Sequence, residues 1–128
     1  MYRKFTLNLG VRSVQEAVDF YRDVMGFDLD ATVPETAPFD WAQVSYGKIA
    51  LMFQTADSLK RGLTLFAIRE TGGVQTLLFE VDNIDYLHMR VEGNAKILLN
   101  LTVTTYGTKE FTFADPNGYV ITFIQQLY

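Results

Sequence analysis

The chain has 128 residues, of which 48% are hydrophobic and 20% charged, and its formal net charge is -4. This acidic balance argues against nucleic acid as a partner, because phosphate binding needs a basic face, and the lack of cysteine excludes disulfides and thiolate metal sites. No apolar run reaches membrane-spanning length and no leader pattern follows Met1, so we expect a cytoplasmic protein that makes no membrane contact.

The first half of the chain alternates between strand and helix patterns. Apolar residues occupy every second position from Phe5 to Val11, which predicts a strand with two different faces. Ser13 and Glu16 form a capping box that begins a helix, and Gly26 ends it. Three strands are predicted next, the first two separated by a loop at Pro34–Pro38: residues 27–33, 41–46 and 48–54.

Residues 55–74 are polar at both ends and are predicted to form a partly extended linker, after which the same plan recurs. A strand over Gln75–Val81 precedes a short helix over Ile84–Val91, which Asn83 caps. Further strands are predicted at residues 97–104, 110–113 and 119–125, the last two joined by an Asp-Pro-Asn-Gly turn that begins at Asp115.

The two halves also share a sequence repeat, in which Thr6, Leu7, Leu9, Val11 and Ser13 correspond to Thr76, Leu77, Phe79, Val81 and Asn83. The repeat predicts an α+β fold of two tandem βαβββ modules, residues 1–54 and 75–128, in one domain over residues 1–128. Each helix can bury its apolar stripe on only one face of its sheet. We therefore expect a curved mixed sheet with helices on its outer face and a cleft lined by the opposite strand faces.

The strand phase predicts which side chains line that cleft. In the fourth strand Ile49, Leu51 and Phe53 match the helix-facing phase, which leaves the alternate positions for the cleft. The predicted ligand-binding residues are Thr6, Asn8, Trp41, Met52, Gln54, Thr76, Glu110, Thr112 and Thr122. Trp41 could stack on a planar or cationic ligand, or it could plug the cleft or a dimer seam.

Two segments of the chain carry a family resemblance. Residues 20–27, FYRDVMGF, end the first helix, and residues 113–121, FADPNGYVI, form the closing turn and strand. Both match the vicinal oxygen chelate superfamily, which includes glyoxalase I, bleomycin-resistance proteins and extradiol dioxygenases. The resemblance covers nearly the whole chain and implies the fold described above, although motifs of this kind report fold and not chemistry.

The resemblance also identifies the positions at which a metal would be held. Metalloenzyme members place His or Gln on the first strand of each half and Glu on the last. The matching positions here are Thr6, Thr76, Thr122, and either Ala50 or Met52. Hydroxyls and thioethers are poor ligands for such ions, so we expect neither a metal nor another cofactor. The single histidine, His88, is predicted to be a packed helix residue.

The resemblance implies a homodimeric protein that binds a small organic molecule, a drug or a metabolite, in a metal-free cleft, with no catalytic residues. The alternative is a superfamily enzyme, either a glyoxalase-like lyase, an epimerase or a dioxygenase. Such an enzyme would use displaced metal ligands or metal-free acid–base chemistry through Glu110 and Gln54. A third hypothesis is a sensing or interaction module without catalysis. Glu110 could equally be a rim residue that faces water.

Overall fold

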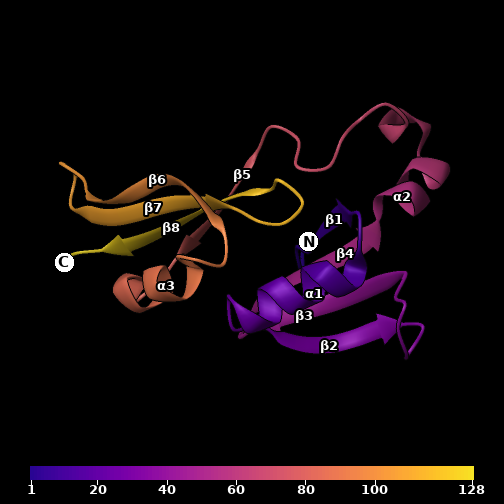
Figure 1. Ribbon diagram of the computed structural model, residues 1–128, viewed down its shortest axis with the longest axis horizontal. Coiled ribbons are helices and arrows are strands. Elements are labelled where there is room, and N and C mark those ends of the chain that lie inside the picture. Colours follow the sequence, from indigo (N-terminus) through magenta and orange to yellow (C-terminus); the bar gives the residue numbers. More distant parts are fainter. The chain divides into compact units, whose positions relative to one another are not determined.

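The computed structural model describes residues 1–128, and the chain divides into two compact units, Met1–Thr71 and Gly72–Tyr128. Each unit holds a four-stranded mixed sheet and the helices that pack on it (Figure 1). In chain order the elements are β1 (Leu7–Val11), α1 (Val14–Asp23), β2 (Asp28–Val33), β3 (Trp41–Tyr46), β4 (Ile49–Thr55), α2 (Ala56–Gly62), η1 (Thr64–Phe66), β5 (Thr76–Glu80), α3 (Ile84–Val91), β6 (Lys96–Val103), β7 (Thr108–Ala114) and β8 (Val120–Gln126).

The first sheet has the strand order β1-β4-β3-β2, so the last strand of the unit lies beside the first. β1 and β4 run parallel, whereas the β4–β3 and β3–β2 pairs are antiparallel. The second sheet repeats this arrangement in the order β5-β8-β7-β6, with β5 parallel to β8. The predicted α+β fold of two βαβββ modules is therefore confirmed.

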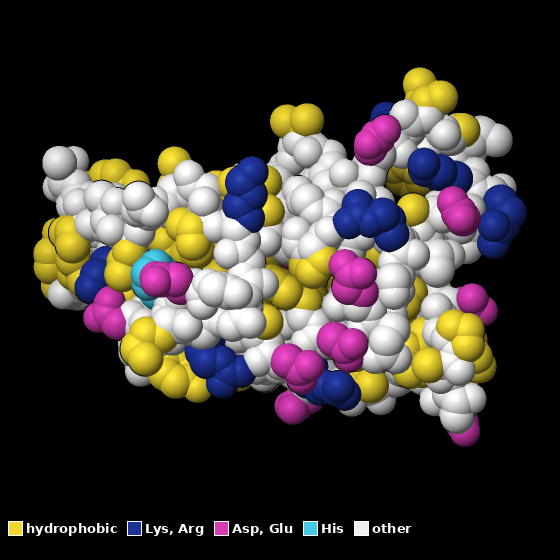
Figure 2. Space-filling view, in the orientation of Figure 1, with side chains coloured by type: hydrophobic (Ala, Val, Ile, Leu, Met, Phe, Trp, Pro, Cys, Tyr) yellow, Lys and Arg dark blue, Asp and Glu magenta, His cyan; other side chains and the backbone are white.

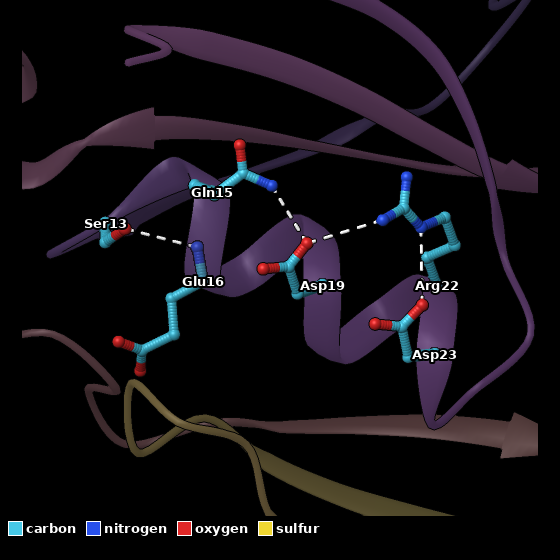
Figure 3. Close-up of polar contacts among 6 residues, drawn as sticks. All are labelled: Ser13, Gln15, Glu16, Asp19, Arg22 and Asp23. Carbon is cyan, nitrogen blue, oxygen red and sulfur yellow. Dashed lines mark hydrogen bonds and ion pairs between the residues drawn. The ribbon is translucent and has the colours of Figure 1, made fainter. Parts of the chain in front are cut away.

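Helix α1 begins where the sequence predicts. The Ser13 hydroxyl accepts the backbone N–H of Glu16 at 3.1 Å, which satisfies one of the helix's otherwise unpaired amides. On the solvent side, Asp19 accepts a hydrogen bond from Gln15 at 2.8 Å and forms an ion pair with Arg22 at 3.5 Å (Figure 3). These contacts are half-exposed and contribute little to stability. They mark this face of α1 as solvated.

The opposite face of α1 packs on the sheet and forms the core of the first unit. Tyr21 and Phe53 are both fully buried, and their ring centroids lie 5.0 Å apart. Phe27 packs against Tyr21 from the end of the helix, with ring centroids 6.1 Å apart at an angle of 84°. These aromatic contacts join α1 to β4 in the middle of the sheet.

Helix α2 lies in the segment that the sequence predicts as a partly extended linker. Thr55 caps it by accepting the backbone N–H of Ser58 at 3.3 Å. A Cβ built on Gly10 would lie 3.1 Å from Leu59 Cδ1, so the helix packs closely over the end of β1. With seven residues and no buried side chain, α2 lacks the apolar stripe on which a prediction of a helix depends.

The second unit is built around α3 and three phenylalanine rings. Asn83 caps α3, and the backbone N–H of Ile84 also donates to Gln125 Oε1 at 2.8 Å, which ties the helix to β8. Phe111 and Phe123 are buried with ring centroids 5.5 Å apart. The Asp115 carboxylate accepts the backbone N–H groups of Asn117 and Tyr119 at 2.8 and 2.9 Å, which holds the turn before β8.

Most predicted elements are present with boundaries shifted by one or two residues. The first strand begins at Leu7, so Phe5, whose side chain is 83% exposed, and Thr6 lie before it. No helix is both long enough and apolar enough to cross a membrane.

Candidate functional site

Each sheet has one face covered by a helix and an opposite, open face. In the first unit the alternation of buried and partly exposed positions separates the two: Val44 and Phe53 are buried towards α1, and the alternate residues of β3 and β4 point the other way. The open face carries Asn8, Trp41, Gln43, Met52 and Gln54. Strand register places these residues side by side, as Asn8 with Met52, Met52 with Gln43, and Gln54 with Trp41.

Hydrogen bonds orient the polar groups of this face. Asn8 Nδ2 donates to Gln54 Oε1 at 3.1 Å, which links β1 to β4. Asp30 accepts from Gln43 Nε2 at 3.2 Å and from the Ser45 hydroxyl at 2.9 Å, which links β2 to β3. The face therefore presents amides and one carboxylate in fixed positions.

The position of Asp30 on this face is not predictable from the sequence. It lies at a register shift in the β2–β3 pair, where Leu29 faces Val44 but Ala31 already faces Gln43. Such a bulge inserts one extra residue and redirects its side chain. Simple alternation along β2 cannot predict this, although three polar residues in six, Asp28, Asp30 and Thr32, are a signal of an edge strand with one wet face.

Trp41 is the aromatic residue of the first open face. It is partly buried at the start of β3, where it pairs with Gln54 on one side and Val33 on the other. No aromatic ring stacks on its indole, unlike Tyr21 and Phe27 on the covered face. A planar or cationic group could therefore occupy the indole surface.

The open face of the second sheet has a different character. A row of paired residues crosses it from Leu78 through Thr122 and Thr112 to Leu99. The hydroxyls of Thr112 and Thr122 lie 2.8 Å apart, so one donates a hydrogen bond to the other. Leu78 and Leu99 are 60% and 66% exposed. Thr76, also predicted to bind a ligand, is exposed on the same face at the start of β5.

Glu110 lies further along β7 and is held by hydroxyl groups. Its Oε2 accepts from the Thr108 hydroxyl at 2.7 Å and from the Tyr106 hydroxyl at 3.0 Å. The single Thr108 hydroxyl proton is used in this bond, so Thr104, whose oxygen lies 2.7 Å away, donates to Thr108. One carboxylate oxygen is thus fixed, while Oε1 accepts no hydrogen bond.

The register also decides which first-half residue corresponds to Thr122. Leu7 faces Leu51 in the first sheet, as Leu77 faces Ile121 in the second, so Met52 is the counterpart of Thr122. These positions carry hydroxyls and one thioether, donors that do not fit a divalent metal. No group of three or more His, Cys, Asp or Glu side chains comes together elsewhere.

His88 lies on the covered side of the second sheet. Its ring is 4.9 Å from that of Phe111 at an angle of 90°, and Nε2 is 3.4 Å from a carboxylate oxygen of Glu92. The Phe111 contact places the imidazole between α3 and β7, so it does not reach the open face.

Comparison with known proteins agrees with this architecture. Residues 5–123 match the family model of the Glyoxalase/Bleomycin resistance protein/Dioxygenase superfamily. No curated protein matches the chain.

Solved structures with the same fold cover nearly the entire chain. A protein of unknown function from Agrobacterium tumefaciens str. C58 is 19% identical with a TM-score of 0.80, covering 99% of this chain and 96% of that one. TnmS3, an antibiotic binding protein from Streptomyces sp. CB03234, is 22% identical with a TM-score of 0.75, covering 98% and 97%. A glyoxalase/bleomycin resistance protein/dioxygenase family enzyme from Burkholderia phytofirmans PsJN is 22% identical with a TM-score of 0.78, covering 95% and 97%.

Proposed function

Because the chain belongs to the Glyoxalase/Bleomycin resistance protein/Dioxygenase superfamily, we propose that it binds a small organic molecule without a metal ion, using the open faces of its sheets. The observation that carries this proposal is the first open face, where an unstacked Trp41 lies beside oriented amides and the Asp30 carboxylate. Ligand sites typically combine apolar or aromatic surface with a few fixed polar groups. This face has both.

The composition of the face favours a planar ligand that carries a positive charge. Stacking of a cation on an indole is worth roughly 0.5–2 kcal/mol. Asp30 supplies a carboxylate whose two oxygens are already positioned by Gln43 and Ser45. The antibiotic binding of TnmS3 supports a small molecule of drug size as the ligand class.

The donors at the family's metal positions support binding without a metal. Thr6, Thr76 and Thr122 offer hydroxyls and Met52 offers a thioether. The Thr122 hydroxyl is further engaged with Thr112. A hard or borderline divalent ion would gain little from these groups against its hydration shell.

Fluorescence tests the proposal directly, because Trp41 is the only tryptophan. We would screen cationic aromatic antibiotics by Trp41 emission and measure the affinity of each hit by calorimetry. The Trp41→Ala and Asp30→Asn variants should each weaken binding about fivefold or more. Tyr86→Ala, which removes an exposed aromatic side chain from α3, is the matched control and should bind normally. If neither the Trp41→Ala nor the Asp30→Asn variant changes the affinity, this face is not the ligand site.

Glu110 favours a second candidate function, an enzyme that uses metal-free acid–base chemistry. A carboxylate with one oxygen fixed by two hydroxyls and the other without a partner is suitably arranged to accept a proton from a substrate. Glu110→Gln separates the two functions. In either case the variant should keep its affinity for the ligand. If the protein is an enzyme, the variant should also lose the turnover that the unchanged protein shows.

We also propose that two copies assemble. Leu78 and Leu99, exposed on the two edge strands of the second open face, support this, since exposed apolar side chains can mark an interface. Light scattering with size-exclusion chromatography should give twice the chain mass of 14.6 kDa. The double variant Leu78→Ser/Leu99→Ser should shift the protein towards the monomer.

A further inference from the structure

A surface pocket in the first unit lies apart from the proposed ligand face. It has a volume of about 690 Å³ and is bounded by the end of β1, by α2, and by residues 67–71. None of the residues predicted to bind a ligand lines it. Its size is within the range of small-molecule sites.

Positive charge distinguishes this pocket from the rest of an acidic chain. Its lining includes four of the chain's 11 Lys and Arg residues, Arg12, Lys60, Arg61 and Arg69, against two carboxylates, Asp57 and Glu70. Figure 2 shows dark-blue Lys and Arg side chains gathered over the region of α2, with a few magenta carboxylates among them. The pocket thus has two positive charges in excess, whereas the whole chain has a formal net charge of -4.

The cations surround the pocket from separate segments. Arg12, at the end of β1, donates from Nη1 to the Thr71 hydroxyl at 3.4 Å, which connects two edges of the pocket 59 residues apart. The Arg69 guanidinium lies 5.7 Å from the centre of the Phe66 ring. Lys60, Arg61 and Arg69 take part in none of the protein's ion pairs. Three cations therefore face the pocket without a carboxylate partner.

We propose that this pocket binds a small molecule that carries an oxyanion, a phosphate monoester in the simplest case. Guanidinium groups present paired N–H donors that match the oxygens of phosphate, and a lysine ammonium adds a point charge. A phosphate monoester carries about -1.5 to -2 charges at pH 7, which balances the pocket's excess. Asp57 and Glu70 oppose longer polyanions.

A lipid headgroup could present the same phosphate. Leu65, beside the pocket, and Ile68, in its lining, are 70% and 94% exposed, and such side chains can enter the interfacial region of a bilayer. The experiment therefore needs one arm for a soluble phosphate and another for a membrane surface.

The soluble arm uses phenyl phosphate, with uncharged phenol as the comparison ligand, in calorimetric titrations at low ionic strength. We expect phenyl phosphate alone to bind. Arg61→Gln and Arg69→Gln should each raise its Kd about fivefold to tenfold, as expected for loss of a charged hydrogen bond. Lys48→Gln is the control. It also removes one positive charge, but Lys48 precedes the start of β4, whereas Thr55 in the pocket ends that strand, so this variant should leave the Kd unchanged.

The membrane arm uses vesicles of phosphatidylglycerol in phosphatidylcholine, with pure phosphatidylcholine as control. If the protein sediments with the anionic vesicles and Arg61→Gln abolishes this sedimentation, the lipid headgroup is the source of the phosphate. The proposal is overturned if neither ligand binds at millimolar concentration, or if Lys48→Gln weakens binding as much as Arg61→Gln. Trp41→Ala should leave phenyl phosphate binding intact, which separates this pocket from the proposed ligand face.

Discussion

The hydroxyl oxygens of Thr112 and Thr122 lie 2.8 Å apart across β7 and β8, in the middle of the open face of the second sheet. The family resemblance matches Thr122 to a position at which metalloenzyme members carry a carboxylate. Here that position is instead joined to its neighbour by a neutral hydrogen bond. A polar pair of this kind stabilises the strand pairing, and loss of either partner leaves the other without a bond.

This pair predicts a non-additive effect on stability. Thr122→Val should lower the free energy of unfolding by about 1 kcal/mol, because the Thr112 hydroxyl, on a side chain only 8% exposed, loses its partner. The double variant Thr112→Val/Thr122→Val should cost less than the two single changes together. Urea denaturation of the four proteins measures the coupling, and strictly additive values would contradict it.

Truncation of one buried side chain on the covered face of the first sheet should cause a large loss of stability. Phe53→Ala should reduce the free energy of unfolding by about 3–5 kcal/mol, because the ring is fully buried against Tyr21 and leaves a cavity. Phe5→Ala removes the same ring from an 83% exposed position before β1 and should cost less than about 0.5 kcal/mol. Similar losses in the two variants would argue against this core.

The close packing of α2 on β1 at Gly10 leads to a prediction about stability. Gly10→Val should destabilise the protein by about 1–3 kcal/mol, because a Cβ added at this position would lie 3.1 Å from Leu59 Cδ1 and 3.6 Å from Ala56 Cα. Gly62→Val adds the same side chain where nothing lies within 4 Å of the Cβ. Thermal unfolding should therefore show a clear loss of stability for the first variant and little change for the second.

Metal analysis gives a prediction about the cofactor. We expect the purified, untagged protein to contain no stoichiometric metal and to show no tight site in titrations with Zn²⁺, Ni²⁺, Mn²⁺ or Fe²⁺. The physical reason is the weak donor set of hydroxyls and a thioether. Chelation with EDTA should leave the melting temperature unchanged. A tightly held ion at one per chain would require other ligands and would favour the enzyme.

The sequence predicts the fold well because periodicity and capping act locally. The Ser13 cap, the Asn83 cap and the alternation along β4 are each determined by residues within one element, and the structure has all three. The repeat then specifies how the elements connect. Helix α2 is missed because it has no buried apolar stripe and packs over the end of β1, which is distant in sequence.

The candidate site is less predictable, since it depends on which side chains meet across strands. Alternation correctly places Asn8, Met52 and Gln54 on one face. It cannot reveal that Asp30 reaches Ser45, because a register shift in β2 changes the side-chain direction. Nor can it reveal that the hydroxyls of Tyr106 and Thr108 hold Glu110.

The strand order has a consequence for synthesis of the protein on the ribosome. In both sheets an inner position is taken by the strand that is made last, β4 in the first and β8 in the second. Until Val120–Gln126 has emerged, β5 has no neighbour in its sheet, and β7 has only β6. The first unit can close its sheet once β4 is made, while the second is still incomplete, so the nascent chain should pass through a stage with one finished sheet and one unpaired strand.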